Sequence, residues 1–143
     1  MDPKAACMTD PDAPYHAHVY YDPAERSAAA ALRDDFGRNS AILFVGAMAD
    51  GAAGPHPIAQ YEVHFLARSR DAVVAAIAAT GLRALVHPLT DDDVADHTSL
   101  AQWIGEPVDL DLTVLDPPGG NQGIPRFGLS DFQASTGPSA PST

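Results

Sequence analysis

With 143 residues, 45% of them hydrophobic and 19% charged, the chain is long enough to bury one sizeable core and has the composition of a soluble globular domain. Its formal net charge of −11, with only 8 Lys and Arg residues, argues against nucleic acid or an anionic membrane as a partner. A single cysteine excludes an internal disulfide, and no apolar leader or membrane-length apolar run is present, so we expect a cytoplasmic protein.

The first half of the chain predicts two strands around a helix. Residues 1–13 are rich in Asp, Pro and Ala, and we expect a flexible arm there. Residues 15–21 alternate as a half-buried strand. Asp22, Pro23 and Glu25 then form a capping-box pattern that starts a helix, which runs to about Phe36 and stops at Gly37. The apolar stripe predicted for this helix is Ala28, Leu32 and Phe36. Residues 41–48 are apolar throughout and predict the second strand.

The second half continues the alternation. Residues 58–66 predict a strand, and Ser69 caps a second helix that stops at Gly81. The apolar stripe of this helix is Ala72, Val73, Ala76 and Ile77. Residues 82–88 predict a fourth strand. A third helix, capped by Thr90 and ended by Gly105, and a last strand over residues 108–115 complete the domain, which we place at residues 14–116. The Pro/Gly/Ser-rich tail, residues 117–143, is expected to be largely disordered, although Ile124–Leu129 can dock.

The order β-α-β-β-α-β predicts an α+β, ferredoxin-like split βαβ sandwich with an added C-terminal helix and strand. Its antiparallel sheet has the strand order 4-1-3-2, and both helices of the motif cover one face. The apolar set of each strand then faces these helices, and the polar set lies on the helix-free face. On the first, third and fourth strands that polar set is His16, His18, Tyr20, Gln60, Glu62, His64, Arg83 and His87.

The helix-free face has the residues of a metal site. His16 and His18 stand two apart on the central strand, about 6.5–7 Å between Cα atoms, with Glu62 and His87 on the flanking strands. Imidazoles at that separation can converge on one ion, and two histidines with a carboxylate are typical of non-haem Fe(II) oxygenases. Each residue also has an ordinary explanation, since a solvated or packed His pair and a solvent-facing Glu62 produce the same pattern.

Two further histidines lie outside the strands. His56 is in the Gly/Pro loop at residues 49–57. It is either an ordinary residue of a rigid loop or a site residue at the rim of the polar face. His97 falls on the inner stripe of the predicted third helix, where it is either a hydrogen-bonded core histidine or directed at the pocket. The accompanying stripe residues are Val94, Ala101 and Ile104.

The stretches "YHAHVYYD", "GPHPIAQYEVHF" and "LVHPLTDDDVADHTSLAQWIGEP" resemble the DOPA 4,5-dioxygenase family, the small ferredoxin-like group of fungi and bacteria, over about residues 14–115. The resemblance implies a non-haem iron enzyme that opens a catechol such as DOPA by extradiol cleavage. It implies Fe(II) on His18, His87 and either Glu62 or His16, with O₂ and the aromatic diol as reactants.

The same resemblance suggests roles for the remaining polar residues. His97 or His56 suits proton transfer, and Tyr20 suits the pocket wall or a hydrogen bond to bound oxygen. Arg83 suits a substrate carboxylate, and His64 is a second substrate-contacting candidate. Two alternatives stay open: a non-catalytic, dimeric module that binds a metal or small ligand, and a wet dimer interface on the polar face. We expect a homodimer.

Overall fold

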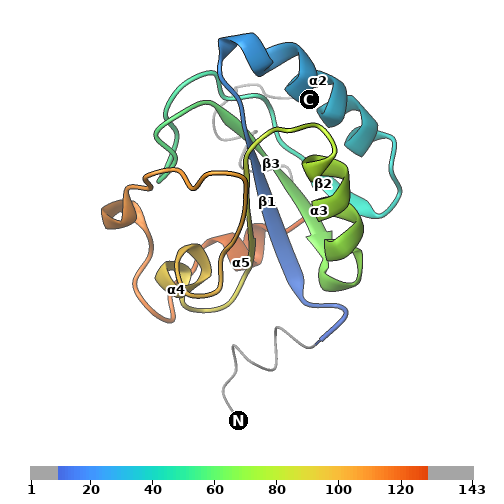
Figure 1. The fold of residues 1–143 in the computed structure, drawn as a ribbon. Helices are drawn as coiled ribbons and strands as arrows, with labels where there is room; N and C mark the ends of the chain where they lie inside the picture. The colour runs from blue at the N-terminus through green and yellow to red at the C-terminus, as the bar shows by residue number, and fades with distance from the viewer. Residues whose placement is uncertain (1–9, 129–143) are drawn as a thin grey trace, which may run out of the picture.

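A five-stranded antiparallel sheet forms the centre of the computed structural model, which describes residues 10–128 (Figure 1). Most of the expected arm and tail, residues 1–9 and 129–143, lies outside the described residues. The sheet order is β2-β3-β1-β4-β5, so β1 is central. The strands are β1 Pro14–Tyr20, β2 Ile42–Val45, β3 Gln60–Leu66, β4 Ala84–Pro88 and β5 Gln102–Ile104.

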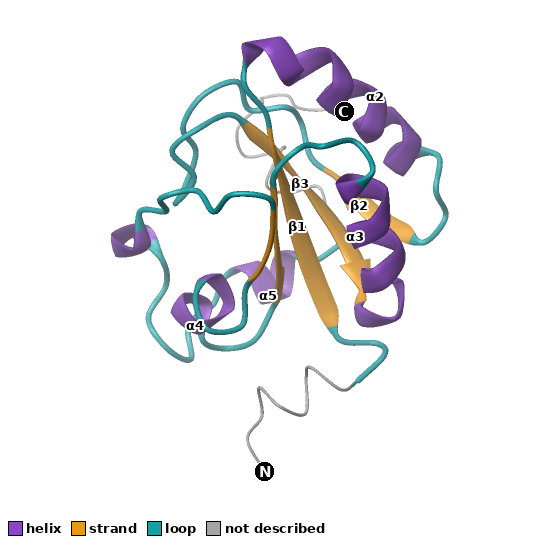
Figure 2. Cartoon of the chain, in the orientation of Figure 1, coloured by secondary structure: helices purple, strands orange, loops and turns teal. Residues whose placement is uncertain are grey.

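Helices lie on both faces of this sheet (Figure 2). The α-helices are α2 Arg26–Gly37, α3 Arg70–Ala78, α4 Asp93–His97 and α5 Gly123–Arg126, and the 3-10 helices are η1 Pro23–Glu25, η2 Ala67–Ser69 and η3 Leu112–Val114. The predicted capping box is confirmed: the Asp22 carboxylate accepts the Glu25 N–H at 2.8 Å, and the Glu25 carboxylate accepts the Asp22 N–H at 3.0 Å. No helix in the described part of the chain is long and apolar enough to cross a membrane.

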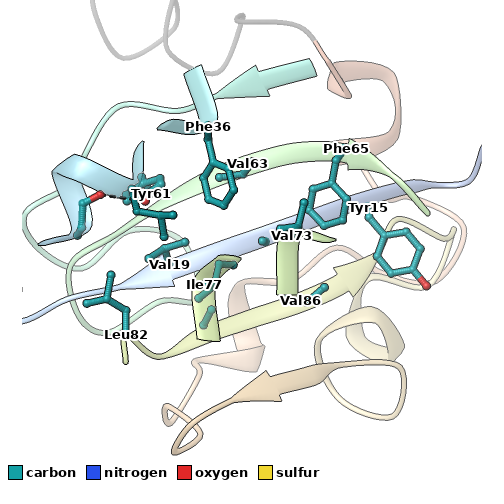
Figure 3. Close-up of a cluster of buried hydrophobic side chains, with 14 of the residues drawn as sticks. Tyr15, Val19, Phe36, Tyr61, Val63, Phe65, Val73, Ile77, Leu82 and Val86 are labelled. Atoms are coloured by element: carbon teal, nitrogen blue, oxygen red, sulfur yellow. Dashed lines mark hydrogen bonds between the residues drawn. The ribbon is translucent and has the colours of Figure 1, made fainter. Parts of the chain in front are cut away.

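The main core lies between the sheet and the pair α2 and α3 (Figure 3). The apolar sets of β1, β3 and β4 face these helices, as the alternation predicted. The helices bury Ala29, Leu32, Phe36, Val73 and Ile77. Ala28 and Ala72 were predicted to be buried and are exposed. Ala29 takes the place of Ala28 because α2 packs its 29 side against β3, where the Tyr61 hydroxyl donates to the Ala29 carbonyl at 3.0 Å.

The α+β class is confirmed, whereas the full strand order differs from the predicted 4-1-3-2. The neighbours of β1 are β3 and β4, as expected, but β5 pairs with β4 and extends the sheet to five strands. Unpaired N–H and C=O groups along an edge strand favour such pairing. Consequently β4 is an inner strand, flanked by β1 and β5.

The predicted third helix and last strand were wrong. The helix spans only α4, because the Asp92 side chain, not that of Thr90, accepts the first-turn N–H of Ala95, and because Thr98 leaves helical geometry. Residues 102–104 form β5 instead, in keeping with the preference of aromatic and β-branched side chains for strands. Residues 108–115 form no strand; they include η3, and the Asp111 N–H donates to the Pro55 carbonyl at 2.8 Å.

The second face of the sheet is covered, which corrects the expectation of a helix-free surface. Helices α4 and α5 and the connections around residues 53–57 and 114–123 lie over it. All six histidines of the chain are there, and none is more than 7% exposed. The sheet therefore has an apolar core on one face and a buried polar cluster on the other.

Candidate metal centre

The six histidines form one connected cluster of rings. His16 and His18 come from β1, His64 from β3 and His87 from β4, while His56 precedes β3 and His97 ends α4. Three close ring pairs link them, with centroids 4.0 Å apart for His16 and His64, 4.1 Å for His18 and His56, and 4.3 Å for His87 and His97. Residues far apart in the sequence thus share one site.

The strand register explains this convergence. In the antiparallel pairs, His16 lies opposite His64 on β3 and opposite His87 on β4, and His18 lies opposite Glu62. Directly opposed residues project from the same face of a sheet, so the register delivers all of these side chains to one side. The sequence predicted this arrangement, in which β1 lies between β3 and β4.

Three of these histidines form a group suited to hold an ion. One ring nitrogen from each of His16, His18 and His87 lies within 4.8 Å of the others, and all three residues are buried. Imidazole is a common ligand of iron, zinc and copper, and three such ligands leave open coordination positions.

The hydrogen bonds of His18 and His87 leave two bare nitrogens facing each other. The Nδ1–H of His87 donates to the Pro88 carbonyl at 2.8 Å, and the Nδ1–H of His18 donates to the Gln60 amide oxygen at 3.0 Å. Burial lowers the pKa of both rings well below 6.5, so both are neutral and carry only a lone pair at Nε2. These two Nε2 atoms are 3.1 Å apart. Two lone pairs repel at that distance, and a shared cation would turn the repulsion into attraction.

His16 contributes a third nitrogen with the same need. Its Nε2 atom is buried and has no hydrogen-bond partner among the described residues. Burial, followed by the neighbouring histidines, lowers the pKa of His16 well below 6.5. Buried polar atoms nearly always have a partner, so this orphaned nitrogen fits a metal ligand. The donor set present therefore fits a divalent transition metal.

Glu62, the expected carboxylate ligand, is engaged elsewhere. Its Oε2 accepts from the Nε2 of His64 at 2.5 Å, and the Nδ1 of His64 accepts the Gly128 N–H at 2.9 Å. Both ring nitrogens of His64 are thus occupied, and its ring stacks on Phe127 with centroids 5.4 Å apart. The structure brings Glu62 close to His16 and His64 rather than to the pair of His18 and His87.

A cavity of about 320 Å³ lies over the histidine group. His56 and His97 line it, whereas Tyr20 and Arg83 do not. The Tyr20 hydroxyl lies 2.7 Å from Nδ1 of His56 and donates to it, since this buried phenol has no other acceptor among the described residues. Burial raises the pKa of Tyr20 and lowers that of His56 to about 3, so this pair stays neutral.

The other wall of the cavity was not predicted from the sequence. It consists of the first residue of α4 and of the chain from residue 114 onward: Asp93, Val114, Leu115, Asp116, Asn121, Gln122, Gly123 and Arg126. The single sequence signal for this wall was the apolar docking segment at residues 124–129. Its polar members had no periodic pattern, since they lie in loops and in the short helices α4 and α5.

Comparison with known proteins places this site in context. The model of the Dopa 4,5-dioxygenase family matches residues 15–114, which hold every histidine of the cluster. The chain belongs to the Dopa 4,5-dioxygenase family. The resemblance inferred from the quoted stretches is therefore confirmed.

Two relatives of this family member are informative. A protein of Amanita muscaria named DOPA 4,5-dioxygenase is 32% identical over 111 residues, which are 71% of this chain and 49% of that protein. The chain thus spans about half the length of that curated relative. A crystal structure from Nostoc punctiforme, named a "putative dioxygenase", is 38% identical with a TM-score of 0.67, covering 71% of this chain and 90% of that one.

Proposed function

We propose that this chain is a non-haem iron-dependent extradiol dioxygenase that opens the ring of a catechol such as DOPA or a related aromatic diol. The observation that carries the proposal is the pair of bare Nε2 atoms of His18 and His87, 3.1 Å apart at the floor of a cavity. Membership of a family named for a dioxygenase supports the same chemistry.

His18, His87 and His16 would hold the ion, with His16 in place of Glu62 because Glu62 is paired with His64. When bound, Fe(II) supplies the Lewis acidity and the electron path by which O₂ reacts with a catechol. The hydrogen bonds of His18 to Gln60 and of His87 to the Pro88 carbonyl fix the ring orientation and the tautomer of both ligands.

Two histidines outside the ligand set would handle protons. The Nδ1–H of His97 donates to the Asp93 carbonyl at 2.8 Å, which leaves Nε2 as the ring nitrogen that can accept a catechol proton. The Nδ1 of His56 accepts the hydrogen bond from the Tyr20 hydroxyl, so the ring proton of His56 is on Nε2. That N–H can donate a hydrogen bond to a substrate oxygen. Because both line the cavity, each can reach a bound diol without leaving its place.

The test is reconstitution of the protein with Fe(II) under anaerobic conditions, followed by exposure to air and a panel of catechols. We expect about one iron per chain, uptake of one O₂ per catechol and a yellow ring-opened semialdehyde. His18→Ala should abolish iron binding, a loss larger than the roughly 10–100-fold that follows removal of a ligand's hydrogen-bond partner.

Glu25→Ala is the control, because Glu25 belongs to the capping box of η1 and does not line the cavity. This variant should keep its iron and its turnover. Iron binding without oxygen uptake on any catechol would favour the alternative, a non-catalytic metal-binding module. A protein that binds neither iron nor a catechol would contradict both.

A further inference from the structure

The arginines of the described residues differ in whether they have a partner. Most of them pair with a surface aspartate or a backbone carbonyl: Arg26 with Asp50, Arg33 with the Gly46 carbonyl, Arg38 with Asp35, Arg68 with Asp12 and Arg70 with Asp71. The guanidinium groups of Arg83 and Arg126 form no hydrogen bond or ion pair with any described residue. These two cations are therefore available to a ligand.

Only one of these two arginines lies at the candidate site. Arg126, the last residue of α5, lines the same cavity as the histidine group and is the sole Lys or Arg among its described lining residues. Arg83 precedes β4 and packs against Gly105, away from that lining. The cavity thus has the candidate metal-binding histidines on one side and, on the other, one arginine without a partner among the described residues.

The acidic residues of the cavity do not need Arg126, because each has a donor already. The Glu62 carboxylate accepts from His64, the Asp93 carboxylate accepts the Asp116 N–H at 2.9 Å, and the Asp116 carboxylate accepts the Gln122 N–H at 2.9 Å. Within residues 10–128, therefore, Arg126 has no internal ion pair, and its charge is left for the occupant of the cavity.

A local cation matters in this chain because its formal net charge of −11 repels anions at long range. A guanidinium matches a carboxylate in shape, with two parallel N–H donors for two oxygens. The cavity volume of about 320 Å³ is at the small end of ligand sites, which suits a single aromatic ring with a short side chain.

We infer that Arg126 is a specificity-determining residue that binds the carboxylate of an anionic catechol in this cavity. The inference rests on the proposed function, since it concerns the same cavity. Unsubstituted catechols and catecholamines would lack the partner for Arg126 and bind more weakly.

The test is equilibrium binding without turnover, on iron-reconstituted protein kept free of O₂. The probes are 3,4-dihydroxyphenylacetate, which carries a carboxylate, and 4-methylcatechol, which is neutral. Arg126→Gln should weaken binding of the first about tenfold or more, as for loss of a hydrogen bond to a charged group, and change binding of the second less than about twofold. Arg126→Lys should restore part of the loss, because it returns the charge without the fork.

Arg38→Gln is the matched control: it removes the same charge from the exposed end of α2, and both affinities should stay unchanged. An equal effect of Arg126→Gln on the two probes, or none, overturns the inference, as does a selective loss in Arg83→Gln. If any of these results is obtained while the unaltered protein binds both probes, only the inference about Arg126 is contradicted and the proposed function is not. If it binds neither, the proposed function and this inference fall together.

Discussion

At the scale of single residues, the unusual feature is a group of histidines that stay uncharged. Burial and the mutual repulsion of neighbouring rings lower the pKa of His16, His18 and His87 well below 6.5 and that of His56 to about 3. A neutral imidazole is the form that binds metal, so the fold prepares the ligands before an ion arrives. The same pKa shifts carry a stability cost in acid.

That cost predicts how the metal-free protein responds to pH. Above pH 6.5 these four rings are neutral in both states, whereas below it only the unfolded chain takes up their protons. Each ring then removes about 1.4 kcal/mol of unfolding free energy per pH unit. Asp96 acts in the opposite sense: burial raises its pKa to about 7, so the folded state takes up that proton first and gains stability as the pH falls from 7 towards 4.

The four histidines lower the stability on acidification and Asp96 raises it, so the free energy of unfolding should fall by about 3 kcal/mol between about pH 7.5 and about pH 5.5. Urea denaturation of chelator-treated protein at the two pH values measures it. The Asp96→Asn variant should show a steeper fall, because the opposing carboxyl is gone. A free energy that stays level, or rises on acidification, would mean that these rings are not held neutral.

At the scale of elements, the sequence was a good guide wherever two faces of an element differ. The alternation identified β1 and β3, the capping box of η1 identified the start of the first helical segment, and the order of elements gave β1 its neighbours. The alternation reflects burial, because every second side chain of a strand and every third or fourth side chain of a helix faces the core. The histidine cluster could be expected for the same reason.

The elements near the C-terminus could not be predicted in this way. Thr90 looks like a helix cap, but its hydroxyl donates to Asp96 at 2.6 Å while Asp92 caps α4. Residues 108–115 alternate like a strand, yet β5 already occupies the edge of β4. At the start of α4 a neighbouring cap decided the conformation, and at residues 108–115 the pairing of β5 with β4 did so. No periodic pattern in the sequence reports which of two such competitors prevails.

The buried carboxylate of Asp96 predicts how α4 is held in place. It accepts from the Thr90 N–H at 2.9 Å, from the Thr90 hydroxyl and, at 3.2 Å, from the Asn121 amide. Asp96→Ala removes an acceptor from three buried donor groups and leaves the Thr90 N–H without any, so we expect a loss of about 2–4 kcal/mol in the free energy of unfolding. Chemical denaturation at neutral pH provides the measurement.

Asp71→Ala is the comparison for this variant, because Asp71 lies on α3 with a side chain 94% exposed. It should change the free energy of unfolding by less than about 0.5 kcal/mol. Equal stability of the two variants would show that the Asp96 contacts do not hold α4.

At the scale of the whole molecule, the chain closes the polar face of its own sheet. Among residues 10–128 the main core contains none beyond Ile104, so we expect the sheet and the pair α2 and α3 to fold without the later segment. That segment instead covers the histidines, through Phe127 stacked on His64 and the Asn121 amide bound to the Thr90 carbonyl at 2.7 Å. A partner subunit is not needed to bury the histidines, and the expected homodimer and cytoplasmic location stay predictions.

This division predicts the effect of shortening the chain. A chain that ends after Asp116 loses part of the cavity wall, including Asn121 and Arg126, but keeps His16, His18 and His87. We expect native-like secondary structure by far-UV circular dichroism and retained iron, with binding of 3,4-dihydroxyphenylacetate weakened about tenfold or more because the wall and its cation are gone. A chain that ends after Gly128 keeps every described residue and is the control. If both chains bind the probe equally, the segment from 117 to 128 does not form the binding site; if the shorter one loses its iron, the segment is part of the metal centre itself.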